Sequence, residues 1–169
     1  LILALLESLE STDNVEVFGF DINLDSIKLS EKRIKLNFPN VKVNLVHADF
    51  LDYCINNKSD VFVNKLPKFD VIIANPPYIR TQNLGPEQAQ FLSKNFGLKG
   101  RVDIYQAFLI GMSRCLSADG IAGVIVSNRF LTTKGTGALR QSLYELYDIF
   151  NIWDFGDTKL FDAAVLPAV

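Results

Sequence analysis

The chain has 169 residues, of which 49% are hydrophobic and 21% charged, and its formal net charge is −2. Such a chain is long and apolar enough for a folded domain with its own core, which excludes a disordered or fibrous protein. The weakly acidic balance gives no electrostatic footprint for nucleic acid, so a role on DNA or RNA has to rest on a specific site.

The two cysteines, Cys54 and Cys115, stand far apart and in no metal-ligand spacing, which favours a reducing cytoplasm and argues against structural zinc. The apolar opening contains Glu7 and Glu10 but no basic segment, so it is not typical of a signal peptide. No run approaches the roughly 18 apolar residues of a membrane span. Met112 is the only methionine, and the final AAVLPAV stops inside an apolar run. We therefore expect a segment of a larger cytoplasmic protein without a membrane partner.

Predicted helices and strands alternate through the first half of the chain. In order, they are a helix at 1–9, a strand at 15–20, a helix capped by Asn23 or Asp25, a strand at 41–48, a short helix at 51–55 and a strand at 69–74. The apolar face of the helix after the first strand is predicted to consist of Ile27, Leu29, Ile34 and Leu36.

The second half begins with residues 79–100, which contain Gly85, Pro86, Gly97 and Gly100 and are predicted to form a long loop or lid. After it we expect a helix at 102–116 that stops near Asp119-Gly120, a strand at 121–127, a helix at 139–147, and strands at 149–155 and 163–169. Strands that alternate with helices predict an α/β fold, in which a mostly parallel sheet carries helices on both faces.

Three polar residues, Asp21, Asp49 and Asn75, follow the carboxyl ends of predicted strands, where α/β sheets bind ligands. The Asp21 carboxylate suits the two hydroxyls of a ribose, and Asp49 suits an adenine amine with Phe50 against the ring. Both acids are also common as turn or cap residues, which is the structural alternative. The only histidine, His47, lies inside a predicted strand and is given no role.

The strand at 69–74 is followed by Asn75, Pro76, Pro77 and Tyr78. Neither proline can donate to a strand ladder, so the strand has to end here. An Asn-Pro pair alone is a common turn signal, but it does not explain the Pro-Tyr that follows. A given four-residue word occurs by chance about once in a thousand chains of this size, which favours a functional reason.

The chemistry that fits this motif concerns a conjugated nitrogen, either the exocyclic amine of adenine or an amide. Such a nitrogen is a poor nucleophile because its lone pair is delocalised into the π system. The Asn75 side-chain oxygen and the Pro76 carbonyl can accept its two hydrogens, which frees the lone pair for an electrophile. The prolines fix the backbone in advance, and Tyr78 offers a flat face for stacking. This is catalysis by positioning and local electrostatics, without a strong general base.

These motifs resemble the S-adenosylmethionine-dependent methyltransferases of the NPPY type. More narrowly, they are similar to the adenine-specific DNA methylases of type II restriction-modification systems (Eco57I-like). The resemblance implies a Rossmann-like seven-stranded sheet with helices on both faces, S-adenosylmethionine as the cofactor and double-stranded DNA as a partner. It also implies a fused or separate restriction endonuclease. It runs over almost all of the chain, taken as a single catalytic segment at 1–169.

The resemblance assigns a role to each candidate residue. The cofactor-binding residues are Asp21 and Ile22 in GFDIN, Asp49 and Phe50 in HADFLD, and Asn75. The catalytic residues are Asn75, Pro76, Pro77 and Tyr78. Tyr78 and Phe161 are expected to stack against the extruded base, and no metal ion is expected.

Two parts of the family pattern are expected to lie outside the segment: the first strand with its glycine-rich cofactor loop before Leu1, and a target-recognition domain downstream. The segment alone is therefore not expected to methylate DNA. NPPY is shared by enzymes that act on RNA bases or on a release-factor glutamine, which remain alternatives. The helix predicted at DIYQAF and the helix around Arg140 favour the DNA enzymes. A third alternative is a non-catalytic interaction module with a methyltransferase fold.

Overall fold

The structure is a computed structural model that describes residues 1–56, 67–77, 85–98, 103–128, 131 and 136–156. The chain divides into two compact units, Leu1–Asp60 and Val61–Val169. The described strands of each unit form one parallel pair next to helices, so the predicted α/β class is confirmed. The seven-stranded sheet and the single catalytic segment stay predictions, because the described strands form two separate two-stranded sheets.

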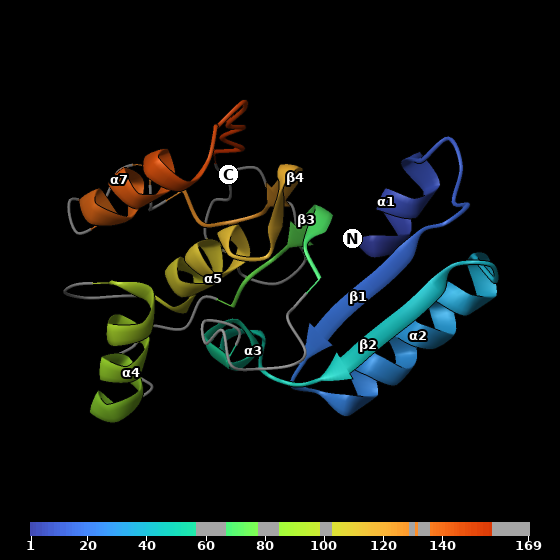
Figure 1. Cartoon of the computed structure of the whole chain (residues 1–169), viewed down its shortest axis with the longest axis horizontal. Coiled ribbons are helices and arrows are strands. Elements are labelled where there is room, and N and C mark those ends of the chain that lie inside the picture. The colour runs from blue at the N-terminus through green and yellow to red at the C-terminus, as the bar shows by residue number, and fades with distance from the viewer. Residues whose placement is uncertain (57–66, 78–84, 99–102, 129–130, 132–135, 157–169) are drawn as a thin grey trace. The chain divides into compact units, whose positions relative to one another are not determined.

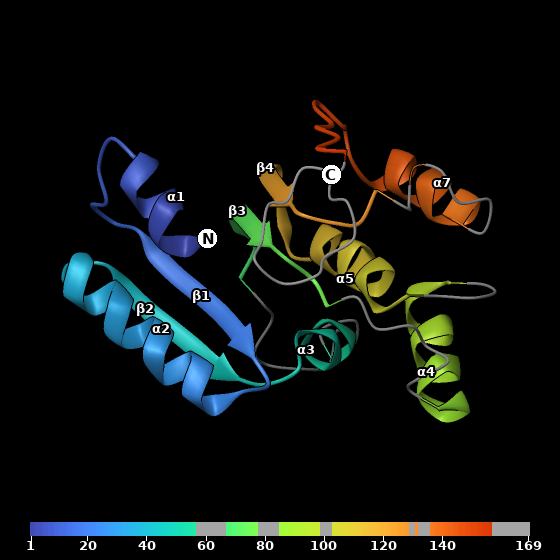
Figure 2. The ribbon, with the colours of Figure 1, turned by 180° about the vertical axis from the view of Figure 1, so that it is seen from behind.

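The N-terminal unit contains the elements that the sequence predicts (Figure 1). In chain order they are α1 (Ile2–Ser8), β1 (Glu16–Asp21), α2 (Leu24–Asn37), β2 (Lys42–His47) and α3 (Phe50–Asn56). Figures 1 and 2 show α2 running along one side of the β1–β2 pair. The expected boundaries differ from these by only one or two residues, which is the usual uncertainty of helix and strand ends.

Helix α2 begins where one of the two predicted caps places it. The Asn23 side chain accepts hydrogen bonds from the backbone N–H groups of Asp25 and Ser26, at 2.9 and 3.0 Å. Two of the four predicted core residues, Ile27 and Ile34, are buried. The other two predictions, Leu29 and Leu36, are wrong, since these side chains are 49% and 78% exposed. Ile27 and Ile34 are seven positions apart and share a helix face. Each mispredicted leucine follows one of them by two positions, which turns its side chain by about 200° around the helix axis.

Strands β1 and β2 pair in parallel, from Glu16 opposite Lys42 to Asp21 opposite His47. One face of the pair packs on α1 and α2. The buried residues of this cluster are Leu6, Val17, Ile34 and Val41. Gly19 lies on that face, where an added Cβ would stand 2.7 Å from Cδ2 of Leu45, so the leucine side chain occupies the space that any larger residue would need.

The opposite face of the β1–β2 pair begins with a charged cluster at its first rung. Lys42 Nζ and Asn44 Nδ2 both lie 2.6 Å from Oε1 of Glu16. The hydrogen bond from Lys42, ahead of that from Asn44, lowers the pKa of the Glu16 carboxyl below its ordinary value. Because these side chains are exposed, water screens their attraction and the cluster adds little to stability.

The C-terminal unit contains β3 (Phe69–Ala74), α4 (Pro86–Phe96), α5 (Ile104–Ser113), β4 (Leu116–Val124) and α7 (Gly137–Leu146). Its core joins α5, α7 and the residues just after β4. The buried members are Tyr105, Leu109, Val126, Leu139 and Leu143.

Helix α4 contradicts the loop predicted for residues 79–100. The Gly and Pro residues that favoured a loop mark the ends of a helix instead: Pro86 is in the first turn, and Gly97 ends the helix in the left-handed region with a φ of 69°. Leu92 and Phe96, four residues apart, are its buried residues. The guanidinium of Arg114 lies 4.7 Å from the centre of the Phe96 ring, which ties α4 to the end of α5.

Strand β4 begins earlier than predicted, at Leu116, so Asp119-Gly120, where the preceding helix was expected to stop, lies inside the strand. The pairing explains the difference. Phe69 is opposite Leu116 but Val71 is opposite Ile121, so β4 carries several extra residues in an irregular bulge. An added Cβ on Gly120 would stand 2.8 Å from the Phe69 carbonyl oxygen, so the bulge brings two backbones into close approach.

The strand predicted at 149–155 is wrong. Residues 149–155 belong to no helix or strand. The predicted pattern was apolar, but a strand also requires a neighbour to complete its backbone hydrogen bonds, and the described residues provide none for this segment. Its apolar side chains stay open to solvent, with Phe150 83% and Trp153 66% exposed. The strand predicted at 163–169 lies outside the described residues.

Candidate active site

The three polar residues predicted to form the site are found at strand ends. Asp21 is the last residue of β1, Asp49 stands between β2 and α3, and Asn75 directly follows β3. Asp21 and Asp49 follow neighbouring parallel strands of the N-terminal unit, so the fold brings these two together. Asn75 belongs to the C-terminal unit, and its place in a shared pocket with the two acids stays a prediction.

The Asp21 carboxylate is exposed and oriented by its own turn. Its Oδ1 accepts a hydrogen bond from the backbone N–H of Asn23 at 2.7 Å. A carboxylate has about four acceptor positions, so this one bond leaves capacity for the hydroxyls of a ligand. Ile22 follows with a side chain that is 75% exposed, which is unusual for isoleucine and is consistent with a ligand contact.

Asp49 initiates helix α3. Its Oδ1 accepts from the backbone N–H of Leu51 at 2.8 Å, and its carbonyl accepts from Tyr53 N–H at 3.1 Å. The alternative interpretation as a cap is therefore correct for one of its oxygens. As with Asp21, acceptor positions remain for a ligand amine, so the structural and functional roles are compatible.

Phe50 lies in an aromatic cluster beside Asp49. Its ring centre is 5.7 Å from that of Phe20, and the ring of Tyr53 is 4.5 Å from Phe20, both in tilted arrangements. Such pairs stabilise by about 0.5–1.5 kcal/mol beyond burial alone. The cluster holds the half-buried Phe50 ring in a defined position at the start of α3, directly after Asp49.

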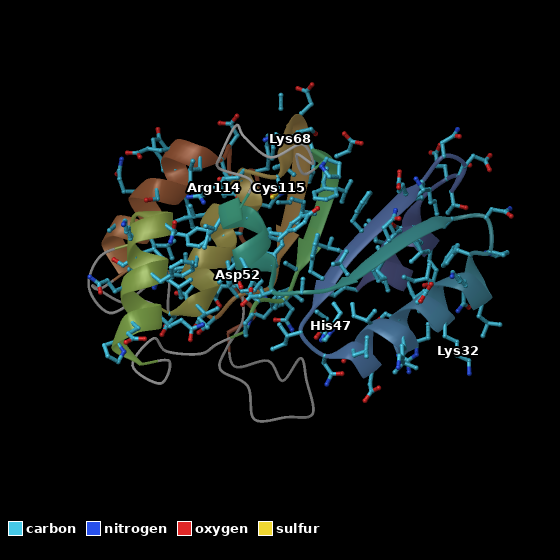
Figure 3. The ribbon with its side chains drawn as sticks, turned by 60° about the horizontal axis from the view of Figure 1, so that its bottom comes forward. Lys32, His47, Asp52, Lys68, Arg114 and Cys115 are labelled. Carbon is cyan, nitrogen blue, oxygen red and sulfur yellow. The ribbon has the colours of Figure 1, made fainter. Side chains whose placement is uncertain are left out.

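His47, to which the sequence assigns no role, lies beside the candidate site. It lies opposite Asp21 in the last rung of the β1–β2 pair, and its Nε2 is 2.9 Å from the carbonyl oxygen of Ile22. Figure 3 labels it at the end of β2, next to the turn that leads from β1 into α2. The sequence shows only that a lone histidine precedes Asp49 by two residues, and its contact with the Ile22 carbonyl depends on the pairing of the two strands.

The Asn75-Pro76-Pro77 stretch begins where the β3–β4 ladder stops. Ile125 N–H donates to the carbonyl of Ala74 at 3.0 Å, which fixes the residue before Asn75. The Asn75 side chain is exposed and forms no hydrogen bond with the residues that the structure describes. Pro76 is buried and Pro77 exposed, so the first proline holds the stretch while Asn75 stays accessible.

Two of the predicted site residues, Tyr78 and Phe161, lie outside the described residues. Among the residues that are described, no group of three or more His, Cys, Asp and Glu side chains is arranged to hold a metal ion. No helix in the same part of the chain has the length and hydrophobicity to span a bilayer.

Comparison with known proteins identifies the family to which the chain belongs. The sequence profile of the Eco57I restriction-modification methylase family matches residues 15–161, which include every described candidate residue. The chain belongs to this family. The Eco57I-family chain is 45% identical over 162 residues to type II methyltransferase M.BanIII of Aneurinibacillus aneurinilyticus, covering 93% of the chain and 28% of the relative. It thus spans less than a third of the length of that relative.

A further relative and a solved structure also match the chain. The chain is 29% identical over 116 residues to MJ0928 of Methanocaldococcus jannaschii, which carries a provisional name as a protein N5-glutamine methyltransferase; the match covers 67% of the chain and 51% of MJ0928. The crystal structure of the type IIG restriction endonuclease BpuSI matches with a TM-score of 0.54 and 18% identity, over 75% of the chain and 15% of BpuSI. This likeness supports the α/β fold of the Eco57I-family chain.

Proposed function

We propose that the full-length protein transfers a methyl group from S-adenosylmethionine to the exocyclic amine of adenine in DNA, within a restriction-modification system. The observation that carries the proposal is the accessible Asn75 side chain at the end of β3, followed by two prolines and Tyr78. Membership of the Eco57I methylase family and the likeness to M.BanIII support the same reaction class.

The residues of the N-terminal unit fit the nucleoside part of the cofactor. Asp21 and Asp49 each hold one backbone N–H and keep acceptor positions for ribose hydroxyls and an adenine amine. Ile22 follows Asp21 and Phe50 follows Asp49, and the proposal assigns both side chains to the apolar parts of the cofactor. When bound, S-adenosylmethionine supplies an electrophilic methyl group on a positively charged sulfur.

The residues after β3 act on the target nitrogen. The Asn75 oxygen and the Pro76 carbonyl accept the two hydrogens of the adenine amine, which draws its lone pair out of conjugation. With S-adenosylmethionine bound, these residues would hold the amine nitrogen for methylation, and the methylated nitrogen would then lose its proton to water. Tyr78 and Phe161 stack against the extruded base in this proposal.

The partners of the reaction are double-stranded DNA, bound through the full-length protein, and a fused or separate restriction endonuclease. The formal net charge of the chain is −2, so the proposal assigns DNA binding to the full-length protein. The cytoplasm, where DNA and S-adenosylmethionine meet, is the proposed location.

A specific observation favours a second candidate function, methylation of a protein glutamine. The relative MJ0928 shares 29% identity over 116 residues and carries that provisional assignment. The chemistry is similar because an amide nitrogen is conjugated like the adenine amine. A non-catalytic module is disfavoured, because a structural role does not require an exposed asparagine before two prolines.

The test is transfer of radiolabelled methyl groups by the full-length protein to DNA, to RNA and to a release factor in parallel. Labelled DNA that digests to N6-methyl-2′-deoxyadenosine is the expected result. Label on the release factor alone or on RNA alone would identify that molecule, and not DNA adenine, as the substrate. No label on any of the three would support the non-catalytic alternative. The Asn75→Ala variant serves as the control for transfer by this site.

A further inference from the structure

The turn from β1 into α2 carries two of the proposed cofactor contacts, Asp21 and Ile22, and it is held on three sides. The carbonyl of Asp21 accepts from the backbone N–H of Ala48 at 3.1 Å, and the Asp21 carboxylate accepts from Asn23 N–H at 2.7 Å. The third restraint acts on the carbonyl of Ile22, which lies 2.9 Å from Nε2 of His47. The first two restraints belong to the strand ladder and to the turn itself, and the third comes from a side chain of the neighbouring strand β2.

The chemistry of the third contact defines the state of the imidazole. A carbonyl oxygen only accepts hydrogen bonds, so Nε2 of His47 must carry the hydrogen and donate it. The bond joins the end of β2 to the residue after β1, across the last rung of the pair. It therefore fixes the peptide plane that follows Ile22, and with it the direction of the Ile22 side chain.

Packing does not replace this restraint. The Ile22 side chain is 75% exposed, so no surrounding core holds it in place. His47 is exposed as well, and its ring belongs to neither described hydrophobic cluster. A hydrogen bond from an exposed histidine to the backbone contributes little to global stability, but it selects one conformation of a short turn.

From these contacts we propose that His47 is a positioning residue for the cofactor. Its Nε2–H holds the Ile22 carbonyl so that the Asp21 carboxylate and the Ile22 side chain face the ligand before it binds. The proposal rests on the proposed function, since it assigns Asp21 and Ile22 to the S-adenosylmethionine site. It makes His47 part of the binding step and gives it no contact with the reacting atoms.

Three substitutions separate a positioning role from a structural one. His47→Ala removes the donor. His47→Gln places an amide N–H near the position of Nε2, whereas His47→Asn places it nearer to Nδ1 and too short to reach. Losing one hydrogen bond that orders the turn should weaken S-adenosylmethionine binding about fivefold in the Ala and Asn variants. The Gln variant should bind within about twofold of the wild type.

A matched control removes a different side-chain hydrogen bond between the two strands. Asn44→Ala deletes the bond to Glu16 at the far end of the pair, at 2.6 Å in the structure. Cofactor affinity should not change, because this bond restrains no part of the turn. Melting temperatures of all variants report on folding, and they should stay close to one another.

The experiment uses the full-length protein, with calorimetry for the dissociation constant and steady-state methyl transfer for kcat and KM. The expected pattern is a higher KM for S-adenosylmethionine in the Ala and Asn variants, a KM restored by Gln, and an unchanged kcat. Equal affinity in all variants, or equal loss in Gln and Asn, would overturn the role of His47 while leaving the proposed function intact. A wild-type protein that binds no S-adenosylmethionine would overturn the proposed function and the role of His47 together.

Discussion

Replacing Asp21 tests the cofactor site most directly. In the structure its Oδ1 accepts from Asn23 N–H at 2.7 Å, and the rest of the exposed carboxylate is available to two ribose hydroxyls. Hydrogen bonds to a charged group contribute about 1.5–3 kcal/mol, and exposure favours the lower figure for each. Asp21→Ala removes both proposed ribose bonds, or about 3 kcal/mol, which corresponds to roughly a hundredfold weaker binding.

Asp21→Asn provides the conservative comparison. The amide keeps one oxygen for the Asn23 N–H, so the turn should survive, but it loses the charge and one acceptor. Binding should weaken about tenfold. Asp21→Ala also loses the turn hydrogen bond, so it should lower protein stability by about 1 kcal/mol where Asp21→Asn does not.

Isothermal titration of the full-length protein with S-adenosylmethionine measures these changes, and methyl transfer at saturating cofactor measures kcat. A rise in the dissociation constant with kcat within about twofold is expected, since uniform binding is lost and the reacting atoms are not touched. Asp25→Asn, one turn further along, is the control for removal of a nearby negative charge. Unchanged affinity in Asp21→Ala, or a fall in kcat alone, would refute the assignment.

Three other predictions concern catalysis, packing and pH. Asn75→Ala should lower kcat by about 100- to 1,000-fold with little change in cofactor affinity, because an acceptor for the target amine is lost. Single-turnover methyl transfer measures this rate, and a wild-type rate in the variant would exclude the proposed role of Asn75. Gly120→Ala should destabilise by about 1–3 kcal/mol in urea unfolding, since its Cβ would stand 2.8 Å from a carbonyl oxygen of β3. Gly123→Ala, whose nearest contact would be an ordinary 3.8 Å, is its control in the same strand, and equal effects would argue against the close approach. The hydrogen bond from Lys42 is the first cause of the lowered pKa of the Glu16 carboxyl. The stability that this carboxylate contributes is fully present above the ordinary pKa of 4.5 and is lost as pH falls through the lowered value. The stability deficit of Glu16→Gln should therefore vanish toward low pH, and a deficit that grows there would contradict the direction of the shift.

The sequence predicted the N-terminal unit well because its signals are local. Asn23 is a strong cap, and the alternation of apolar residues in the two strands has a period that only a strand explains. The error within this unit, the exposure of Leu29 and Leu36, came from counting apolar residues without checking their angle around the helix.

The C-terminal unit was harder to predict because its features depend on what lies beside each segment. Gly85 and Gly97 are equally compatible with a loop and with helix ends, and α4 is decided by the burial of Leu92 and Phe96. The bulge in β4 depends on the register with β3, which no pattern within 116–124 encodes. The apolar run at 149–155 satisfied strand propensity without a partner strand among the described residues.

In the candidate site, too, the features with local signals were predictable and those that depend on neighbouring strands were not. The motif at Asn75 and the two acids could be found from the sequence because each follows a strand, and their local positions agree with that expectation. The contact of His47 with the Ile22 carbonyl could not be found, because it depends on which residues face each other across two strands. The assembly of Asp21, Asp49 and Asn75 around one ligand remains a prediction for the methyl-transfer and binding experiments.

The close approach of Gly19 to Leu45 has an evolutionary consequence. A methyl group at position 19 would meet a movable side-chain tip at 2.7 Å and not a rigid backbone, so the strand can accept alanine only if the leucine shrinks or swings aside. The two sites therefore share a fixed volume, and homologues with alanine at 19 should carry valine or a smaller residue at 45. Since Leu45 packs against the buried cluster of the N-terminal unit, an uncompensated exchange at position 19 should disturb that cluster and lower stability.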